Sequence, residues 1–314
     1  MTRIRTTVIA LVSLLALAAL VAGCGGGDSE QPPSPSALVI DSARALKAQK
    51  PARFAFDTQA RVDEVVPAAG AGPQVQQFAG APSSLGLSGA LSPEAVQADG
   101  SASFAGQTFT AEALAGAQEV YVRFLGSWYG TKAIGLQQLR QQAEQAGGKS
   151  SDQAFNELVA NIERYGKDVF TGEVTEGPEI DGTPTWQSEG TLNVDGLEQI
   201  AEQQGQQVTA EDREVLEKVA QGTTLTYLIG QEDKLPRRVK FALDIKPSEF
   251  AASARENSED LKQVEQVKAS FTVNMSKWGE PVKITPPANF QPIEQLAQRL
   301  LGGAAAGGGG FPGQ

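Results

Sequence analysis

The sequence of 314 residues contains no histidine and only one cysteine, Cys24. Without histidine, Ser-His-Asp and Cys-His mechanisms lack their general base, and zinc and copper sites lack imidazole ligands. A single thiol has no partner within the chain for a disulfide. The GxSxG motif of many serine hydrolases is also absent. We therefore expect a protein that is not an enzyme and that uses neither a metal nor another cofactor.

Carboxylates are the catalytic side chains that the sequence does supply in number. Glu173, Glu176, Glu179 and Asp181 lie close together, which raises the possibilities of paired-carboxylate hydrolysis and of calcium binding. Their spacing does not match the ligand positions of an EF-hand loop. We interpret the cluster as a solvated acidic hairpin, and an envelope hydrolase that uses carboxylates alone is the weakest hypothesis for function.

A secretory signal peptide precedes the cysteine. Two arginines are followed by an uncharged, largely apolar run over residues 8–22. This run has the length of a signal-peptide core and is shorter than the roughly 20 residues that span a bilayer. Val21, Ala22 and Gly23 directly before Cys24 resemble a bacterial lipobox, in which the cysteine thiol is acylated with diacylglycerol. The alternative is an ordinary cleaved signal with an accidental cysteine.

The charge of the mature protein indicates how it is held at the membrane. Removal of residues 1–23 deletes two positive charges, so the formal net charge falls from −11 to −13. Nucleic acid and anionic lipid head groups repel such a chain, so neither a nucleic-acid partner nor electrostatic membrane binding fits. We expect a covalent lipid anchor on Cys24 that places the protein on the outer face of the cell membrane.

Composition divides the chain into a domain and two flanking segments. Residues 24–36 are rich in Gly, Ser and Pro and form the lipidated tether, and the Gly-rich tail at 302–314 has the same character. Both segments are expected to be disordered. Residues 37–301 between them form a single domain.

Hydrophobic periodicity predicts a mixture of strands and helices in this domain. Helices are expected at 37–48, 136–145, 152–164, 194–204 and 209–221, the last with capping chemistry at Thr209. Strands are expected at 54–62, 100–104, 107–114, 119–125, 170–175, 185–191, 223–229, 237–245 and 267–275. Residues 67–92 lack clear periodicity and are interpreted as a long loop. This order predicts an α+β fold with a mostly antiparallel sheet covered on one side by helices.

Several apolar side chains are expected on the inner face of this sheet. They are Phe54, Phe56, Tyr227, Phe241 and Leu243. A sheet with amphipathic helices over its apolar face either closes into a packed core or leaves a cavity, and the burial pattern does not separate the two. Taken one by one, these residues are better explained as core, because protein interiors are densely filled.

The last strand carries a resemblance to a known family. The segment 271–284 reads FTVNMSKWGEPVKI and is followed by two prolines. It resembles the closing signature of the LppX/LprG-type lipoproteins of mycobacteria and their relatives, with Trp278 and Gly279 in its turn. Residues 119–123 before Trp128-Tyr129 look like a further passage of that family, and so does Leu235-Pro236-Arg237-Arg238. We interpret Trp278 as structural, since an aromatic residue after a strand usually packs the next segment in place.

The resemblance implies a fold and a function. Members of that family are similar to the carriers LolA and LolB, with a strongly curved antiparallel sheet, a half-barrel, whose concave apolar face is covered by helices. An apolar cavity between sheet and helices takes acyl chains. By this resemblance, the chain would be a lipoprotein that carries or presents lipid in the cell envelope, with lipid as its ligand and a transporter as a possible partner. The alternative is a non-enzymatic binding or scaffold lipoprotein with a filled core.

Overall fold

The computed structural model of the chain describes residues 32–49, 53–76, 79, 83–104, 107–132, 134–145, 160, 170–203, 207–250, 262–296 and 298. The expected signal peptide with Val21, Ala22 and Gly23, Cys24 and the tail at 302–314 lie outside these residues, as does nearly all of the helix expected at 152–164. Within the described residues, no helix combines the length and the apolar character needed to cross a membrane.

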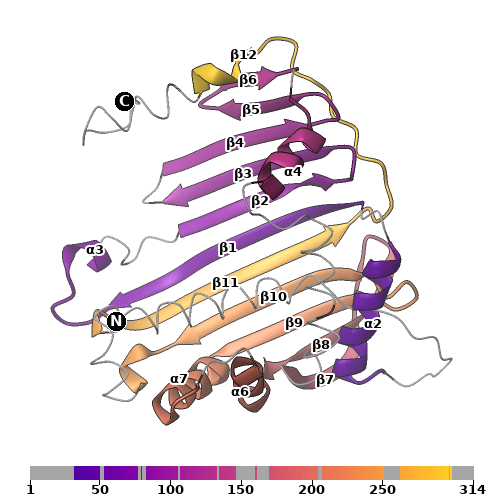
Figure 1. Cartoon of the computed structure of the whole chain (residues 1–314). Coiled ribbons are helices and arrows are strands. Elements are labelled where there is room, and N and C mark those ends of the chain that lie inside the picture. Colours follow the sequence, from indigo (N-terminus) through magenta and orange to yellow (C-terminus); the bar gives the residue numbers. More distant parts are fainter. Residues whose placement is uncertain are drawn as a thin grey trace.

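A single open sheet of twelve strands dominates the fold (Figure 1). Its strand order is β12-β6-β5-β4-β3-β2-β1-β11-β10-β9-β8-β7, and every neighbouring pair is antiparallel except β12 with β6. The strands are β1 (Phe54–Pro67), β2 (Ser83–Leu91), β3 (Val96–Phe104), β4 (Gln107–Ala115), β5 (Val120–Phe124), β6 (Ser127–Thr131), β7 (Phe170–Ile180), β8 (Thr183–Leu192), β9 (Thr223–Gly230), β10 (Pro236–Ile245), β11 (Val264–Ser276) and β12 (Gln291–Pro292). The expected α+β class with a large, mostly antiparallel sheet is confirmed.

Few helices accompany the sheet in the described part of the chain. They are α2 (Pro35–Ala48), α3 (Pro73–Gln76), α4 (Leu136–Gln145), α6 (Val194–Gln203), α7 (Ala210–Gln221) and the 3₁₀ turn η1 (Pro247–Glu249). Thr209 caps α7 in a capping box, because its hydroxyl accepts from the Asp212 amide while the Asp212 carboxylate accepts from the Thr209 amide. This cap fixes the start of α7 where the sequence predicts it.

The region expected to be a loop at 67–92 contains a strand instead. Strand β2 lies in the middle of the sheet, paired with β1 on one side and with β3 on the other. Its sequence SSLGLSGAL is rich in Ser, Gly and Ala, which have low intrinsic strand propensity. The interpretation as a loop was wrong because pairing with two neighbours, rather than local propensity, stabilises this strand.

The strand expected at 119–125 also differs from the structure. It ends at Phe124, and Leu125 and Gly126 form a turn with φ of 47° and 78° that leads into β6. Both turn residues have a left-handed backbone conformation, as a two-residue hairpin turn of type I′ requires. Strand β6, which the sequence analysis did not predict, thereby joins the sheet.

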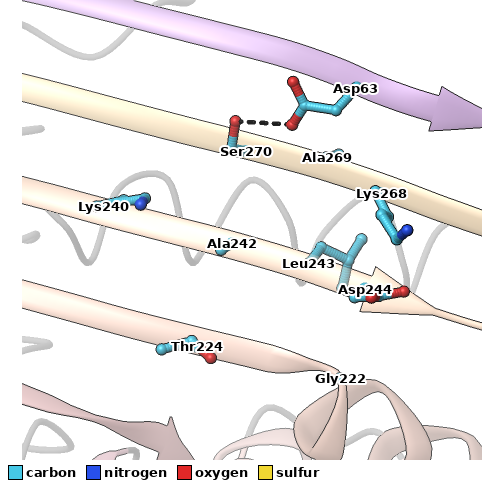
Figure 2. Close-up of a pocket in the computed structure, with 10 residues that line it drawn as sticks. All are labelled: Asp63, Gly222, Thr224, Lys240, Ala242, Leu243, Asp244, Lys268, Ala269 and Ser270. Carbon is cyan, nitrogen blue, oxygen red and sulfur yellow. Dashed lines mark hydrogen bonds between the residues drawn. The ribbon is translucent and has the colours of Figure 1, made fainter.

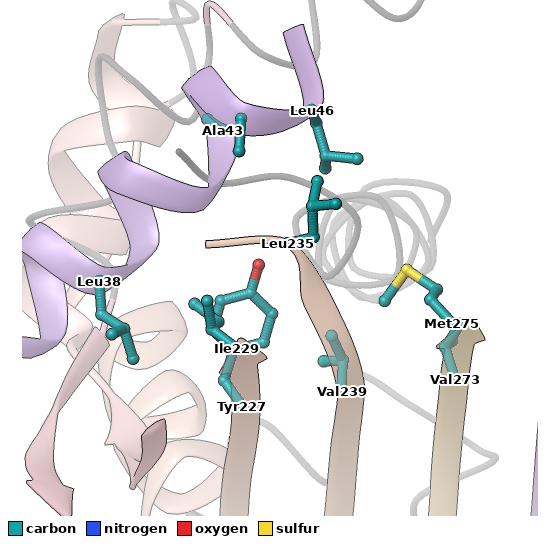
Figure 3. Close-up of a cluster of buried hydrophobic side chains, with 10 residues drawn as sticks. Leu38, Ala43, Leu46, Tyr227, Ile229, Leu235, Val239, Val273 and Met275 are labelled. Carbon is teal, nitrogen blue, oxygen red and sulfur yellow. The ribbon is translucent and has the colours of Figure 1, made fainter. Parts of the chain in front are cut away.

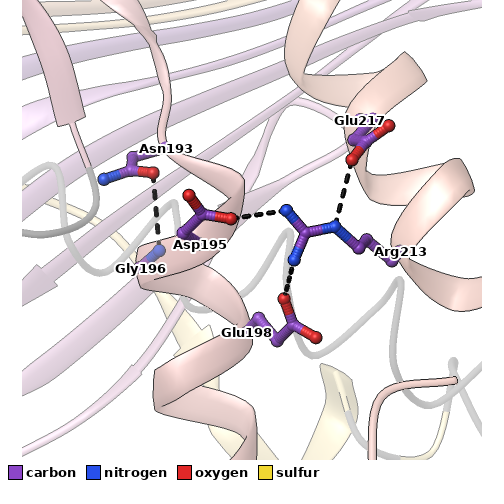
Figure 4. Close-up of polar contacts among 6 residues, drawn as sticks. All are labelled: Asn193, Asp195, Gly196, Glu198, Arg213 and Glu217. Carbon is purple, nitrogen blue, oxygen red and sulfur yellow. Dashed lines mark hydrogen bonds and ion pairs between the residues drawn. The ribbon is translucent and has the colours of Figure 1, made fainter. Parts of the chain in front are cut away.

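Helices α6 and α7 pack against each other and against β8. Leu192, Leu197 and Ala220 form a small buried cluster between them. Arg213 of α7 lies among three carboxylates, with its guanidinium 2.5 Å from Asp195 and 3.1 Å from Glu217 and also bonded to Glu198 (Figure 4). Because Arg213 is partly exposed, this network holds the two helices in register more than it stabilises the fold.

Candidate functional site

One face of the sheet carries an uninterrupted band of apolar and small side chains. The pairing registers align one row of residues across eight strands, from β8 to β4. In order, the row is Gly190, Leu225, Phe241, Phe271, Ala60, Leu85, Ala102 and Phe109. The row contains no charged residue. Since side chains alternate between faces along a strand, this row and its period-two neighbours define what we call the apolar face.

Helix α2 covers one end of the apolar face and fills it (Figure 3). The cluster beneath it joins side chains of α2 to side chains from β9, β10 and β11 and to Leu235. Its buried members are Leu38, Ala43, Ala45, Leu46, Tyr227, Ile229, Leu235, Val239, Val273 and Met275. This end of the face is therefore packed core.

Tyr227 is a member of this packed cluster. Its hydroxyl lies 3.4 Å from the Ser42 hydroxyl of α2. Burial raises the pKa of the Tyr227 phenol, because the surrounding side chains desolvate the phenolate. Tyr227 is thus a neutral hydrogen-bonding side chain between helix and sheet.

The other sequence-predicted cavity residues lie on the same face. Phe54 packs at the edge of the cluster, and its ring stacks on Trp278 with centroids 4.8 Å apart. Phe56 follows with its ring centroid 6.4 Å from that of Phe54. Phe241 and Leu243 are half-buried and lie further along β10, away from α2. The structure places all five residues on the apolar face.

Trp278 and Gly279 fix the chain after β11. The Trp278 indole donates to the carbonyl oxygen of Pro236 at 3.1 Å, and the Gly279 amide donates to the carbonyl of Arg53 at 2.8 Å. Gly279 has φ of 81°, a left-handed conformation that glycine adopts without strain. The signature residues thus hold the ends of β1, β10 and β11 together.

The apolar face changes character on the far side of β1. Leu85 of β2 and Phe109 of β4 are 58% and 43% exposed, although they continue the row that is packed near α2. Between them lies only the small side chain of Ala102. In the next row, Gly100 and Ala111 are equally small. This part of the face therefore offers apolar surface that is partly exposed at Leu85 and Phe109.

Sequence analysis missed Leu85, Leu87 and Phe109 as site residues. The signal was present in β2, where Leu85, Leu87, Gly89 and Leu91 alternate with small or polar residues. The alternation was obscured because glycine and alanine occupy both sets of positions. Pairing across the sheet identifies the face to which each residue belongs.

A hollow lined by residues that the structure describes lies on the opposite face of the sheet (Figure 2). It has a volume of about 290 Å³ and is lined by Asp63, Gly222, Thr224, Lys240, Ala242, Leu243, Asp244, Lys268, Ala269 and Ser270. Its ionic side chains have partners nearby: Lys268 donates to Glu64 at 2.6 Å, and Asp244 accepts from Gln266 at 2.6 Å. A charged, open hollow does not suit an acyl chain, so it is not the apolar cavity that the family resemblance implies.

The acidic cluster at the β7–β8 hairpin has no metal-binding arrangement. Glu173, Glu176, Glu179 and Asp181 are exposed, and Asp181 with Gly182 forms the turn with φ of 50° and 75°. Among the described residues, no three acidic, histidine or cysteine side chains lie close enough together to hold a metal ion.

Comparison with known proteins relates this arrangement to two solved structures. The chain is similar to mycobacterial lipoproteins. Lipoprotein LppX of Mycobacterium tuberculosis shares 12% identity over 77% of this chain and 95% of its own, with a TM-score of 0.33. LprF of Mycobacterium bovis shares 16% identity over 82% of this chain and 100% of its own, also with a TM-score of 0.33.

Both solved structures are of mycobacterial lipoproteins, and the identity to each is low. No protein-family model matches the chain, and no curated protein sequence does. At such low identity, the function has to follow from the residues of this chain.

Proposed function

We propose that the protein is a lipoprotein, acylated on Cys24, that binds acyl chains of lipids against its apolar face and carries or presents them in the cell envelope. Residues 1–23 are then a signal peptide, 24–36 a tether, 37–301 the lipid-binding domain and 302–314 a tail. The protein is not an enzyme under this proposal, and its ligand is a lipid or another acylated molecule. An envelope transporter is a possible partner.

The observation that carries the proposal is the exposure of Leu85 and Phe109 on a face whose other end, under α2, is packed core. Large apolar side chains exposed together on one face usually mark a binding surface. The face has no charge in its central row, and small side chains separate the large ones. An acyl chain matches such a surface, because it is long, narrow and apolar.

The sequence before the domain supports a ligand that comes from a membrane. The lipobox-like residues Val21, Ala22 and Gly23 place a diacylglycerol anchor on Cys24, at the start of the mature chain. A protein anchored in this way stays beside the lipids that it would bind.

The test is organic extraction of the purified mature chain, produced without acylation, followed by mass spectrometry. We expect a lipid with at least one acyl chain to co-purify, and a fluorescent fatty acid to bind with an apolar emission shift. Absence of both would contradict the proposal. Capture of a specific envelope protein, unchanged by Ala60→Trp, would instead favour the scaffold lipoprotein.

A further inference from the structure

The most exposed large apolar side chains of the described residues gather at one end of the sheet. Leu85, Leu87, Phe109 and Leu125 are 58%, 44%, 43% and 63% exposed, and we call them the apolar rim. Leu85 and Phe109 flank Ala102 in register, and Phe124, just before Leu125, pairs with Ala111. Leu125 lies in the turn between β5 and β6, Leu85 and Leu87 lie on β2 and Phe109 lies on β4, strands separated in the sheet order from β9 and β10, which α2 packs against.

The segments that form the rim carry no charge. Residues 65–93, 100–111 and 124–131 contain no Asp, Glu, Lys or Arg, although these residues make up 20% of the whole chain. The mature chain has a formal charge of −13, so anionic lipid head groups repel most of its surface. The uncharged segments of the rim add nothing to this repulsion.

Leu125 occupies a position where folding alone favours a different residue. It stands first in a turn whose two residues both have positive φ, a turn that ordinarily takes Asn-Gly or Asp-Gly. A bulky side chain in this conformation is an outlier and costs conformational free energy. Burial of the Leu125 side chain does not offset that free energy, because the side chain is largely exposed. Neither the turn conformation nor burial favours a leucine at this position.

We propose that the apolar rim rests on the lipid surface of the membrane that holds Cys24. Ser34, the N-cap of α2, lies ten positions after Cys24, and ten extended residue steps reach at most about 35 Å. The thirteen residues of β11 span about 43 Å, which is longer than the reach of the tether. The tether therefore keeps the start of α2 closer to the membrane than the length of this strand. The inference rests on the anchoring in the proposed function but does not require an acyl ligand.

The single cysteine of the chain makes the test direct. Because Cys24 is acylated, Leu125→Cys introduces the one free thiol, which is labelled with nitrobenzoxadiazole in the acylated protein bound to phosphatidylcholine vesicles. Lipids with spin-labelled acyl chains should quench this label severalfold more than the same label at Gln59→Cys, an exposed position on the polar face of β1. Phe109→Cys repeats the measurement at a second rim position. Equal quenching at rim and control positions would overturn the proposal.

Two further measurements identify what the rim contacts. In an Ala60→Trp background, quenching at Leu125→Cys should persist, and its loss would assign the signal to a bound lipid rather than to the membrane. Shielding of the label before vesicles are added would assign the rim to a second copy of the chain and overturn the proposal.

Fatty-acid uptake by the same labelled proteins separates the two proposals. Uptake without quenching overturns the rim contact and leaves the carrier function standing. Quenching without uptake supports the rim contact and contradicts the carrier.

Discussion

Leu85 and Phe271 lie on opposite sides of Ala60, each directly across a strand pair from it. Phe271 packs against the cluster beneath α2, whereas Leu85 is more than half exposed. The apolar face therefore changes from packed core to accessible surface within three neighbouring strands. Ala60, with its small side chain, lies at the boundary.

A large side chain at this boundary should block the accessible part of the apolar face. In Ala60→Trp, we expect the affinity for a fluorescent fatty acid to fall about tenfold or more, since an indole takes up space that a ligand needs. Arg61→Trp is the matched control, because Arg61 is exposed on the opposite face. Fluorescence titration measures both variants, and an equal loss in the two would argue against the apolar face as the site.

The packed and accessible parts should differ in their contributions to stability. Leu38 of α2 is 1% exposed, and Leu38→Ala should lower the unfolding free energy by about 2–5 kcal/mol. Leu85→Ala on the accessible part should change it by no more than about 0.5 kcal/mol. Denaturant unfolding followed by tryptophan fluorescence compares them. Similar losses would show that Leu85 belongs to the core.

Trp278 should contribute through both its ring and its indole nitrogen. Trp278→Ala removes the stacking on Phe54 and the hydrogen bond to Pro236, and should destabilise the fold by about 3–5 kcal/mol. Trp278→Phe keeps a ring beside Phe54 and loses the hydrogen bond, so about 1 kcal/mol is expected from that loss. Unfolding midpoints of the two variants measure the difference. Equal effects would mean that stacking contributes little.

The turn at Leu125 should become more stable with a residue that tolerates left-handed backbone. Leu125→Asn should raise the unfolding free energy by about 1 kcal/mol, because asparagine adopts positive φ more readily than leucine. Leu87→Asn is the control, since Leu87 is an exposed leucine on a regular strand and should show no gain. Thermal unfolding of both variants decides the point.

Asp99 should make the free energy of unfolding depend on pH, because its ionised carboxylate opposes folding. Burial desolvates its carboxylate and Glu112 opposite adds repulsion, so the pKa of Asp99 is raised in the folded chain. A raised carboxyl pKa means that ionised Asp99 opposes folding, and this penalty fades as the pH falls through the folded pKa. Asp99→Asn should therefore stabilise the protein at neutral pH and lose that advantage in acid.

Denaturant midpoints at several pH values measure this effect. Glu280→Gln provides a control at an exposed carboxylate near the end of β11. A stabilisation by Asp99→Asn that is the same at every pH would point to altered packing rather than to the charge.

Strands with strong alternation could be predicted from the sequence. In β10, Val239, Phe241 and Leu243 alternate with charged or small residues, and one face of that strand is apolar in the structure, as expected. The capping box at Thr209 likewise depends on residues three apart in sequence. Such local patterns decide local structure.

Features that depend on distant partners could not be predicted. Strand β2 has a weak strand sequence and exists because β1 and β3 pair with it. Strand β12 pairs with β6 over two residues, Gln291 with Tyr129 and Pro292 with Gly130, and each pair is 162 positions apart in sequence. The accessible apolar surface was missed for the same reason, since Leu85 and Phe109 meet on one face only through the sheet register.

The two edges of the sheet are protected in different ways. Beyond β6, the short strand β12 ends in Pro292, which has no amide hydrogen to offer another strand. Beyond β8, strand β7 displays Glu173, Glu176 and Glu179 on exposed positions, so a second copy approaching this edge meets charge of its own sign. Lipoproteins concentrated in one membrane plane collide often and in similar orientations. Under the anchoring that we propose for this chain, these edges would let many copies crowd together in the membrane plane without joining their sheets into a fibril.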